Sequence, residues 1–286
     1  MAREFDVVLL GATGFTGKLV AQYLAKQSVK WAIAGRNREK LEGVGVNVPI
    51  ILCDTGDRAA CEAMAARTKV VCTTVGPYAK YGAEVVAACA AAGTHYCDLT
   101  GEPHFMRKMI DLHDEQARQS GARIVHASGF DSIPSDLGTW ATQQAFIAKF
   151  GRPAQQVTAY YGAISGGISG GTLASMFEIQ ETMAKDREVR RVLGNPYGLD
   201  PDPRAPRPPA PDDKAPGWDR DLGMFVVPFV MAATNSRVVR RAHAIAGFPW
   251  GDDFVYREVM TTPASVKGAV MAAGITGGLA AMMLAM

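Results

Sequence analysis

The sequence predicts an α/β fold, in which a doubly wound parallel sheet is followed by a second, smaller α/β domain. Two observations support this fold. Short apolar runs alternate with segments of helical spacing over residues 1–131, and that alternation changes character beyond residue 131. We therefore expect one domain over 1–131, a second over 132–263 and a separate apolar segment over 264–286.

The first domain is expected to contain six strands joined by helices. The apolar runs that predict the strands are 5–10, 31–34, 50–53, 70–75, 95–99 and 123–127. Helices are expected over 58–66, 83–92 and about 103–119, and Gly93 is expected to end the second of these. Because ligands bind beyond the carboxyl ends of such strands, we expect four chain segments to meet at one edge of the sheet: Asp54, 76–78, 101–102 and 129–131.

Three glycines, Gly11, Gly14 and Gly17, separate the first strand from a helix. A helix N-terminus attracts anions through its unpaired N–H groups and its dipole, and glycine lets a phosphate approach the backbone. We expect the whole turn to bind a dinucleotide through Gly11, Ala12, Thr13, Gly14, Phe15, Thr16 and Gly17. The helix is predicted from apolar residues that recur at the spacing of one helix face: Leu19, Val20, Tyr23 and Leu24.

The end of the second strand indicates which dinucleotide binds. An NAD enzyme usually has a carboxylate here for the ribose 2′-hydroxyl, whereas this chain has Gly35-Arg36. A guanidinium pairs bidentately with a 2′-phosphate, so the sequence predicts NADPH; the alternative is an ordinary solvated charge. Further cofactor contacts are expected where the third and fourth strands end, at Asp54, Val75, Gly76 and Pro77.

Composition limits the other classes of function. The net charge is only +2 and the charges are dispersed, so no nucleic-acid partner is expected. The five cysteines form no C-x-x-C pair and lie in apolar runs, so we expect reduced core cysteines and no metal site. No apolar leader precedes the first strand, which favours a cytoplasmic location.

The second domain has a glycine-rich loop of its own. It follows a strand expected over 156–164 and contains Gly166, Gly167, Gly170, Gly171 and Thr172. Backbone amides at this helix start could hold a thioester carbonyl or a phosphopantetheine phosphate; the alternative is a set of tight turns. The proline-rich segment 195–217 is expected to form a surface excursion or a partly disordered loop. Strands over 224–232 and 254–261 are expected on either side of a basic helix near 236–245.

Several of these segments together resemble the saccharopine dehydrogenase-like oxidoreductases, and more narrowly the mycobacterial trans-acting enoyl reductases. The most specific are T-V-G-P-Y at 74–78, D-L-T-G-E at 98–102 and G-F-D-S-I-P-S-D at 129–136. The resemblance implies a Rossmann domain joined to a substrate domain. It also implies an NADPH-dependent enzyme of lipid biosynthesis that reduces a carbon–carbon double bond in a polyketide or fatty-acyl intermediate carried by a partner synthase.

Three residues are candidates for the proton transfer that hydride chemistry requires. Tyr78 and Tyr81 follow the fourth strand, and a phenol can donate a proton; alternatively, both simply cap the strand end. Asp131 follows the sixth strand, where it or Ser132 could instead cap the next helix. The histidines at 95, 104 and 126 are expected to be structural.

Two further functions stay open. The first is imine reduction on an amino-acid substrate, with Arg237, Arg240 and Arg241 binding carboxylates, although these arginines could equally be a solvated helix face. The second is an inactive NADP-binding interaction protein.

The last 19 residues, 268–286, carry no charge. They fit either a core or dimer-interface helix of small residues, or a helix on the inner face of the plasma membrane. If the segment forms a dimer interface, the dimer would be a homodimer.

Overall fold

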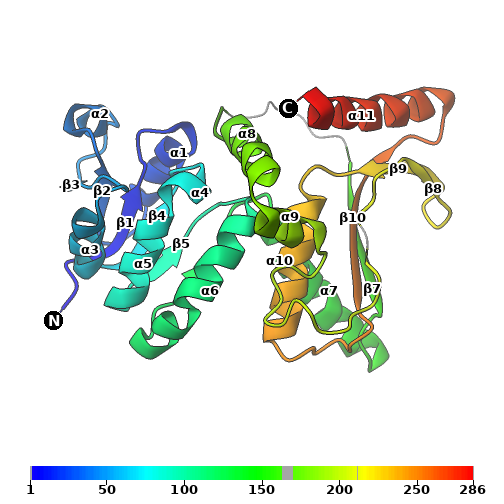
Figure 1. Cartoon of the computed structure of the whole chain (residues 1–286), viewed down its shortest axis with the longest axis horizontal. Helices are drawn as coiled ribbons and strands as arrows, with labels where there is room; N and C mark the ends of the chain where they lie inside the picture. The colour runs from blue at the N-terminus through cyan, green and yellow to red at the C-terminus, as the bar shows by residue number, and fades with distance from the viewer. Residues whose placement is uncertain (1, 163–169, 211, 286) are drawn as a thin grey trace. The chain divides into compact units, whose positions relative to one another are not determined.

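The computed structural model describes residues 2–162, 170–210 and 212–285, and it divides into two compact units (Figure 1). The first unit is Met1–Gly129 and the second is Phe130–Met286.

The first unit is built on a six-stranded parallel sheet, which confirms the predicted fold class. The spatial order is β3-β2-β1-β4-β5-β6. The strands are β1 (Phe5–Leu10), β2 (Trp31–Gly35), β3 (Ile50–Leu52), β4 (Thr68–Thr73), β5 (His95–Cys97) and β6 (Ile124–Val125). The helices are α1 (Phe15–Leu24), α2 (Arg38–Glu42), α3 (Arg58–Arg67), α4 (Tyr78–Tyr81), α5 (Ala83–Ala92) and α6 (Pro103–Ser120). As predicted, Gly93 ends α5, in the left-handed conformation at φ 66°.

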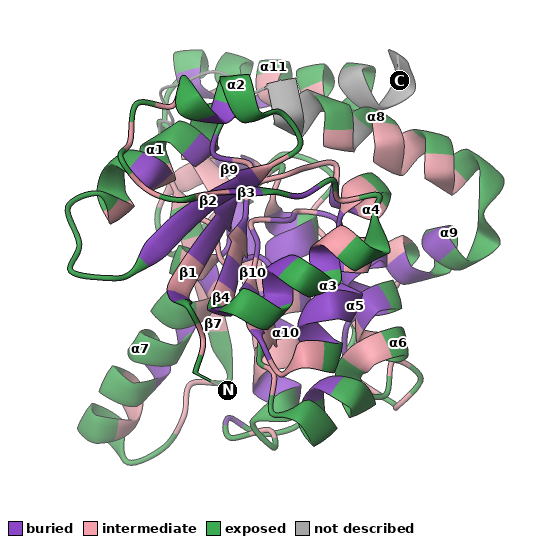
Figure 2. Cartoon of the chain, turned by 90° about the vertical axis from the view of Figure 1, so that its left-hand side faces the viewer, coloured by how far each residue is buried: buried purple, intermediate pink, exposed green. Residues whose placement is uncertain are grey.

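Helices cover both faces of this sheet, and β1 and β2 are buried between them (Figure 2). Successive strand residues face opposite sides, so Val8 packs in the core that includes Met64 of α3, whereas Leu9 packs in the core that includes Ala21 of α1. A central parallel strand therefore has to be apolar on both faces, which explains the continuous apolar run of β1.

The predicted helix is present as α1, but the four apolar residues that predicted it differ in burial. Leu19 and Tyr23 are exposed, by 52% and 64%, whereas Gly17 and Ala21 are buried. Val20 and Leu24 do pack against the core. The face toward the sheet consists mainly of small residues because the helix start lies close to the glycine turn.

Strands β5 and β6 end earlier than predicted because the Asp98 carboxylate binds the chain that follows each of them. Its Oδ1 accepts hydrogen bonds from the N–H groups of Thr100 (3.1 Å) and Ala127 (2.9 Å). Its Oδ2 accepts from the Tyr96 hydroxyl over 2.9 Å and lies 2.7 Å from Nδ1 of His126. His126 is therefore structural as predicted, but it lies just beyond β6 instead of within a strand.

The second unit contains a four-stranded mixed sheet in the order β7-β10-β9-β8. The strands are β7 (Gln156–Tyr161), β8 (Gly217–Asp219), β9 (Met224–Pro228) and β10 (Val255–Thr262). Strand β10 is parallel to β7 and antiparallel to β9. The helices are α7 (Ile133–Phe150), α8 (Gly170–Lys185), α9 (Arg187–Gly194), α10 (Ala232–Ile245) and α11 (Val266–Ala285).

The described part of the proline-rich segment 195–217 has neither helix nor strand before Gly217, and arginines of α10 bind it. Arg237, only 2% exposed, donates to the carbonyl oxygens of Asn195 (3.0 Å) and Leu193 (2.6 Å). Arg240, 5% exposed, donates to the carbonyl oxygen of Pro196 over 2.9 Å. Arg241 likewise donates to the carbonyl oxygen of Leu199 over 2.8 Å. The expectation that these arginines form a solvated face or bind substrate carboxylates is therefore wrong for the two buried ones.

Helix α11 contains most of the uncharged segment 268–286 and contacts β9 and β10 (Figure 1). It starts close to the preceding loop, since a Cβ atom on Gly268 would lie 1.8 Å from the carbonyl oxygen of Pro263. Ala272 is buried, but Val266 and Val270 are exposed by 84% and 67%. Within the described ranges, no helix is long and apolar enough to cross a membrane.

Candidate functional site

The glycine turn between β1 and α1 is the candidate cofactor site, and Gly11 gives it its shape. Gly11 has φ +94°, and a Cβ atom there would lie 2.7 Å from Cγ2 of Val75. Its N–H donates to the carbonyl oxygen of Ala34 over 3.0 Å. A side chain at Gly11 is therefore excluded both by backbone conformation and by the neighbouring strand end.

The other two glycines are needed for different reasons. A Cβ atom on Gly17 would lie 2.1 Å from the carbonyl oxygen of Gly11, so this glycine lets the helix pack against the turn. A Cβ atom on Gly14 would meet only the carbonyl oxygen of Gly11, at 3.6 Å. Gly14 is exposed, occupies the N-cap position of α1 and makes no side-chain cap bond, and the first turn has no acidic residue. This helix start therefore fits a pyrophosphate.

The remaining residues expected in the turn divide between core and surface. Ala12 is fully buried, whereas Thr13, Phe15 and Thr16 are exposed, Phe15 by 78%. An exposed phenylalanine beside a dinucleotide turn provides an apolar surface that a bound cofactor can cover.

Arg36 directly follows β2 and is exposed. Its guanidinium has no hydrogen-bond or ion-pair partner among the residues that the structure describes. On the adjacent strand, Asp54 follows β3 and accepts from the Gly56 N–H over 3.0 Å, which forms a turn. The arginine is therefore free to bind a phosphate, while one oxygen of Asp54 is already used locally.

The end of β4 is tied to the glycine turn. The N–H of Thr74 donates to the carbonyl oxygen of Leu10 over 3.0 Å, and its hydroxyl donates to that of Gly11 over 3.1 Å. These bonds bring Val75 and the cis peptide Gly76-Pro77 beside the turn, as the predicted cofactor contacts require.

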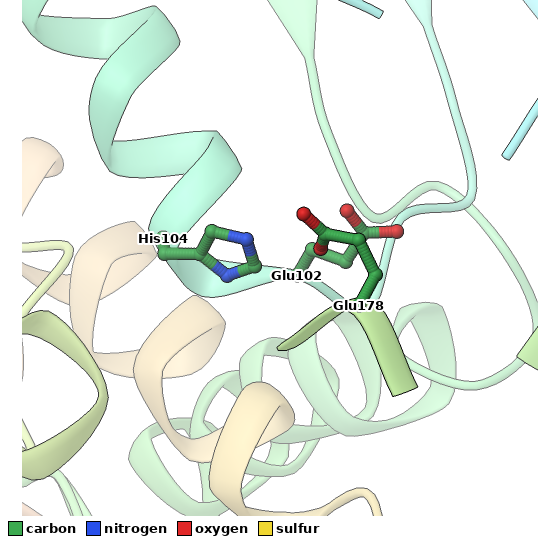
Figure 3. A group of neighbouring side chains, drawn as sticks. All are labelled: Glu102, His104 and Glu178. Carbon is green, nitrogen blue, oxygen red and sulfur yellow. The ribbon is translucent and has the colours of Figure 1, made fainter. Parts of the chain in front are cut away.

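The Glu102 carboxylate was not predicted to have a structural role, but it caps α4. It accepts hydrogen bonds from the N–H groups of Tyr78 (2.9 Å) and Ala79 (2.7 Å), and it is fully buried. Figure 3 shows its side chain together with that of His104 in the first turn of α6; Glu178, drawn with them, belongs to α8 of the second unit. Segments 76–78 and 101–102 thus meet as expected.

The two candidate tyrosines of α4 have different surroundings. Tyr78 is 4% exposed, its hydroxyl donates to the carbonyl oxygen of Thr73 over 3.3 Å, and burial raises the pKa of Tyr78 far above its usual range. Its ring lies 6.2 Å from that of Phe105. Tyr81 is only half-buried. A buried phenol that is already hydrogen-bonded to the backbone is a poor proton donor, so Tyr81 is the better candidate of the two.

In the second unit, Asp131 is exposed and precedes α7. Its carbonyl oxygen accepts from Nδ2 of Asn235 over 2.7 Å. Ser132 occupies the N-cap position, as expected, but its hydroxyl makes no cap bond and instead donates to Oδ1 of Asn235 over 2.8 Å. The start of α7 is therefore fixed by α10 and not by its own cap.

Sequence reasoning missed a buried polar cluster that adjoins this helix start. Glu258 of β10 is 2% exposed, and its Oε1 accepts from the Ser135 hydroxyl (2.6 Å) and from Nδ2 of Asn235 (3.2 Å). The Ser135 hydroxyl also lies 3.0 Å from that of Tyr161. Burial raises the pKa of Glu258. The sequence of β10 gives little signal of this burial, because Arg257 directly precedes Glu258 and two threonines end the strand.

The second glycine loop can be followed only in part. Gly166 and Gly167 lie outside the described residues, whereas Gly170, Gly171 and Thr172 form the start of α8. Their expected contact with substrate stays a prediction.

Comparisons with known proteins identify the type of the first domain and the family of the chain. Residues 7–125 match the model of the saccharopine dehydrogenase NADP-binding domain. A trans-acting enoyl reductase of Mycobacterium tuberculosis is 43% identical over 296 residues, which cover 97% of this chain and 70% of that protein. The trans-acting enoyl reductase of Mycobacterium leprae is 40% identical over 294 residues, with the same coverage.

Saccharopine dehydrogenase (L-Glu forming) from Saccharomyces cerevisiae superimposes with a TM-score of 0.47 at 20% identity, covering 55% of this chain and 34% of that one.

Proposed function

The chain belongs to the family of the trans-acting enoyl reductases, and on this premise we propose that it uses NADPH to reduce a carbon–carbon double bond in a polyketide or fatty-acyl intermediate. The observation that carries the proposal is the glycine turn, which has open space at Gly14 and a free guanidinium at Arg36. The matched NADP-binding domain contains both residues.

The residues of the first unit would bind and orient the cofactor. The N-terminus of α1 would hold the pyrophosphate, and Arg36 would pair with the 2′-phosphate. The segment from Val75 to Pro77, held by Thr74, would lie against the nicotinamide ribose. Bound NADPH supplies a hydride for the β-carbon of the conjugated acyl group.

The acyl substrate is proposed to arrive on a partner synthase, since relatives with this name act in trans. Because the proposed substrate is such an intermediate, we also propose a role in lipid biosynthesis. We further propose a cytoplasmic protein that touches the inner face of the membrane through α11, because Lys267 is the one charged residue of this helix and Val266 and Val270 are largely exposed. The exposed small residues of α11 would equally suit a homodimer interface. Sedimentation with liposomes distinguishes membrane contact from a homodimer.

The alternative of imine reduction on an amino acid loses its support. Arg237 and Arg240, two of its three candidates for binding carboxylates, are buried and donate to the backbone carbonyl oxygens of Leu193 and Pro196. A cofactor-binding protein without activity remains the alternative, and turnover distinguishes it.

The test is reduction of a short 2-enoyl thioester with NADPH that carries deuterium at the transferred position. One deuterium in the saturated product supports the proposal. Tight NADPH binding without reduction of any enoyl thioester would favour the inactive interaction protein.

A further inference from the structure

A hollow in the second unit is lined almost entirely by arginine side chains. Its volume is about 750 Å³, and the residues around it are Arg187, Glu188, Arg190, Arg191 and Arg204. The first four belong to α9, and Arg204 belongs to the proline-rich segment that follows this helix. All five residues lie in the second unit, and all five are exposed. We call this hollow the arginine pocket.

Two of these arginines are held in place by their neighbours. Nη1 of Arg190 donates to the carbonyl oxygens of Met183 (2.6 Å) and Ala184 (3.2 Å) at the end of α8. Nε of Arg191 donates to Oε2 of Glu188 over 2.9 Å. The one carboxylate that lines the pocket is therefore already paired with an arginine.

The other two arginines are unpaired. The guanidinium groups of Arg187 and Arg204 have no hydrogen-bond or ion-pair partner among the residues that the structure describes. The carboxylates beside them in sequence bind backbone instead: Asp186 accepts from the Glu188 N–H over 2.7 Å and Asp202 from the Arg204 N–H over 3.0 Å. Four guanidiniums against one carboxylate leave the pocket strongly positive. Like charges gathered in this way attract an anion.

The residues of the pocket indicate the class of anion. They are all charged, so the pocket offers no apolar side chain to an acyl chain. A guanidinium binds phosphate oxygens as a planar fork, and a phosphate has enough acceptor oxygens to bind several arginines at once. The volume is in the range of sites that hold whole small molecules. The pocket therefore fits a phosphate group that is part of a larger molecule.

We propose that the arginine pocket binds the phosphate of the pantetheine arm that carries the acyl thioester; this identification rests on the proposed function. The arm has its thioester at one end and its phosphate at the other, whether it belongs to a synthase or to coenzyme A. Arg187 and Arg204 would pair with the phosphate oxygens, and the two fixed arginines would add positive charge around them. One end of the arm is then bound while the thioester end stays free.

The first test measures binding alone, by calorimetry with NADP⁺ in excess so that the cofactor site of the first unit is occupied. 4′-Phosphopantetheine should bind at least roughly 10-fold more tightly than pantetheine, which lacks the phosphate. The double variant Arg187→Gln with Arg204→Gln should remove this difference. Its NADP⁺ affinity and its free energy of unfolding should stay unchanged, because both side chains are exposed. Arg220→Gln, at an exposed arginine elsewhere in the unit, is the matched control.

Coenzyme A, titrated in the same way, distinguishes the two sources of the arm. Tighter binding of coenzyme A than of 4′-phosphopantetheine indicates that the pocket also takes the nucleotide phosphates. Equal affinities indicate that it takes the phosphate of the arm alone, as a synthase would present it. Both results support a phosphate site, and both should be lost in the double variant.

The second test is kinetic and compares the crotonyl thioesters of 4′-phosphopantetheine and pantetheine. The wild type should show a kcat/KM at least roughly 10-fold higher for the phosphorylated thioester, and the double variant should lose this advantage through KM with kcat unchanged.

Equal affinity of the wild type for 4′-phosphopantetheine and pantetheine would overturn the proposal. So would a double variant that loses only its binding to phosphatidylglycerol vesicles, because the arginines would then serve an anionic lipid surface. If the wild type reduces no enoyl thioester but the phosphate still strengthens binding, the failure belongs to the proposed function and the phosphate site stands.

Discussion

The backbone of Gly11 lies so close to Gly17 that a Cβ atom on Gly17 would be 2.1 Å from the carbonyl oxygen of Gly11. Gly14, midway between them, has no such neighbour. The three evenly spaced glycines therefore differ in what they tolerate.

We predict that substitutions at these two glycines separate stability from binding. Gly17→Ala forces the helix away from the turn and should cost at least about 2 kcal/mol in the free energy of unfolding. Gly14→Val should leave unfolding nearly unchanged but abolish NADPH binding, because its side chain occupies the space for the pyrophosphate. Urea denaturation and calorimetry measure the two effects. Normal NADPH affinity in a folded Gly14→Val protein would contradict the assigned site.

Arg36 is predicted to make the choice between NADPH and NADH. A bidentate contact with phosphate is worth on the order of 1.5–3 kcal/mol, so Arg36→Ala should lower the preference for NADPH by roughly 10- to 100-fold. Arg38→Ala is the control, since Arg38 is a nearby exposed arginine paired with Glu42 at 3.9 Å. Calorimetric titration of both cofactors measures the preference, and equal affinities in the wild type would refute the role of Arg36.

Arg237 is predicted to hold the proline-rich segment on α10. Its loss leaves the carbonyl oxygens of Leu193 and Asn195 without their donor, and should cost about 3 kcal/mol in unfolding. Arg237→Ala should also speed proteolysis within 195–217, which the intact hydrogen bonds protect. The exposed Arg220 provides the control, Arg220→Ala. Unchanged cleavage rates in Arg237→Ala would show that the segment is held by other contacts.

Asp136, in the first turn of α7, gives a pH-dependent prediction. Burial raises its pKa from 3.8 to about 6. Between these values the native state binds more protons than the unfolded state, so stability falls as the pH rises, and the cost is complete above the native pKa. Asp136→Asn should therefore be more stable than the wild type at pH 7 to 8, with the difference vanishing below about pH 3. Asp221→Asn, on an exposed turn, is the control. An unaltered pH profile of unfolding in Asp136→Asn would contradict the burial effect.

The exposed face of α11 is predicted to contact membranes. Val266→Asp combined with Val270→Asp places charge on residues that are 84% and 67% exposed, so the fold should survive while sedimentation with liposomes is lost. Val230→Asp introduces a charge at another exposed valine of the same unit and serves as the control. Liposome binding that persists in the double variant excludes this face. If only the oligomeric state changes, the face is a homodimer interface.

The sequence by itself determined the sheet of the first unit and its cofactor turn. Strand β1 is recognisable because a central parallel strand is apolar on both faces, and the turn is recognisable because its glycines lie within seven residues of one another. The role of Arg36 was predicted from its position alone, directly after β2. These signals are local, so spacing and residue type are enough to interpret them.

Only the tertiary structure decided which polar groups act together. Ser135 and Glu258 are 123 residues apart in the chain, and nothing in either neighbourhood predicts that they meet. The same holds for Arg237, which looks like a helix-surface charge in sequence but is buried against carbonyl oxygens some 42 to 44 residues away. A buried charged or polar group hydrogen-bonds with the groups that folding brings within reach of it. Its partners therefore depend on the packing of distant elements and not on sequence spacing.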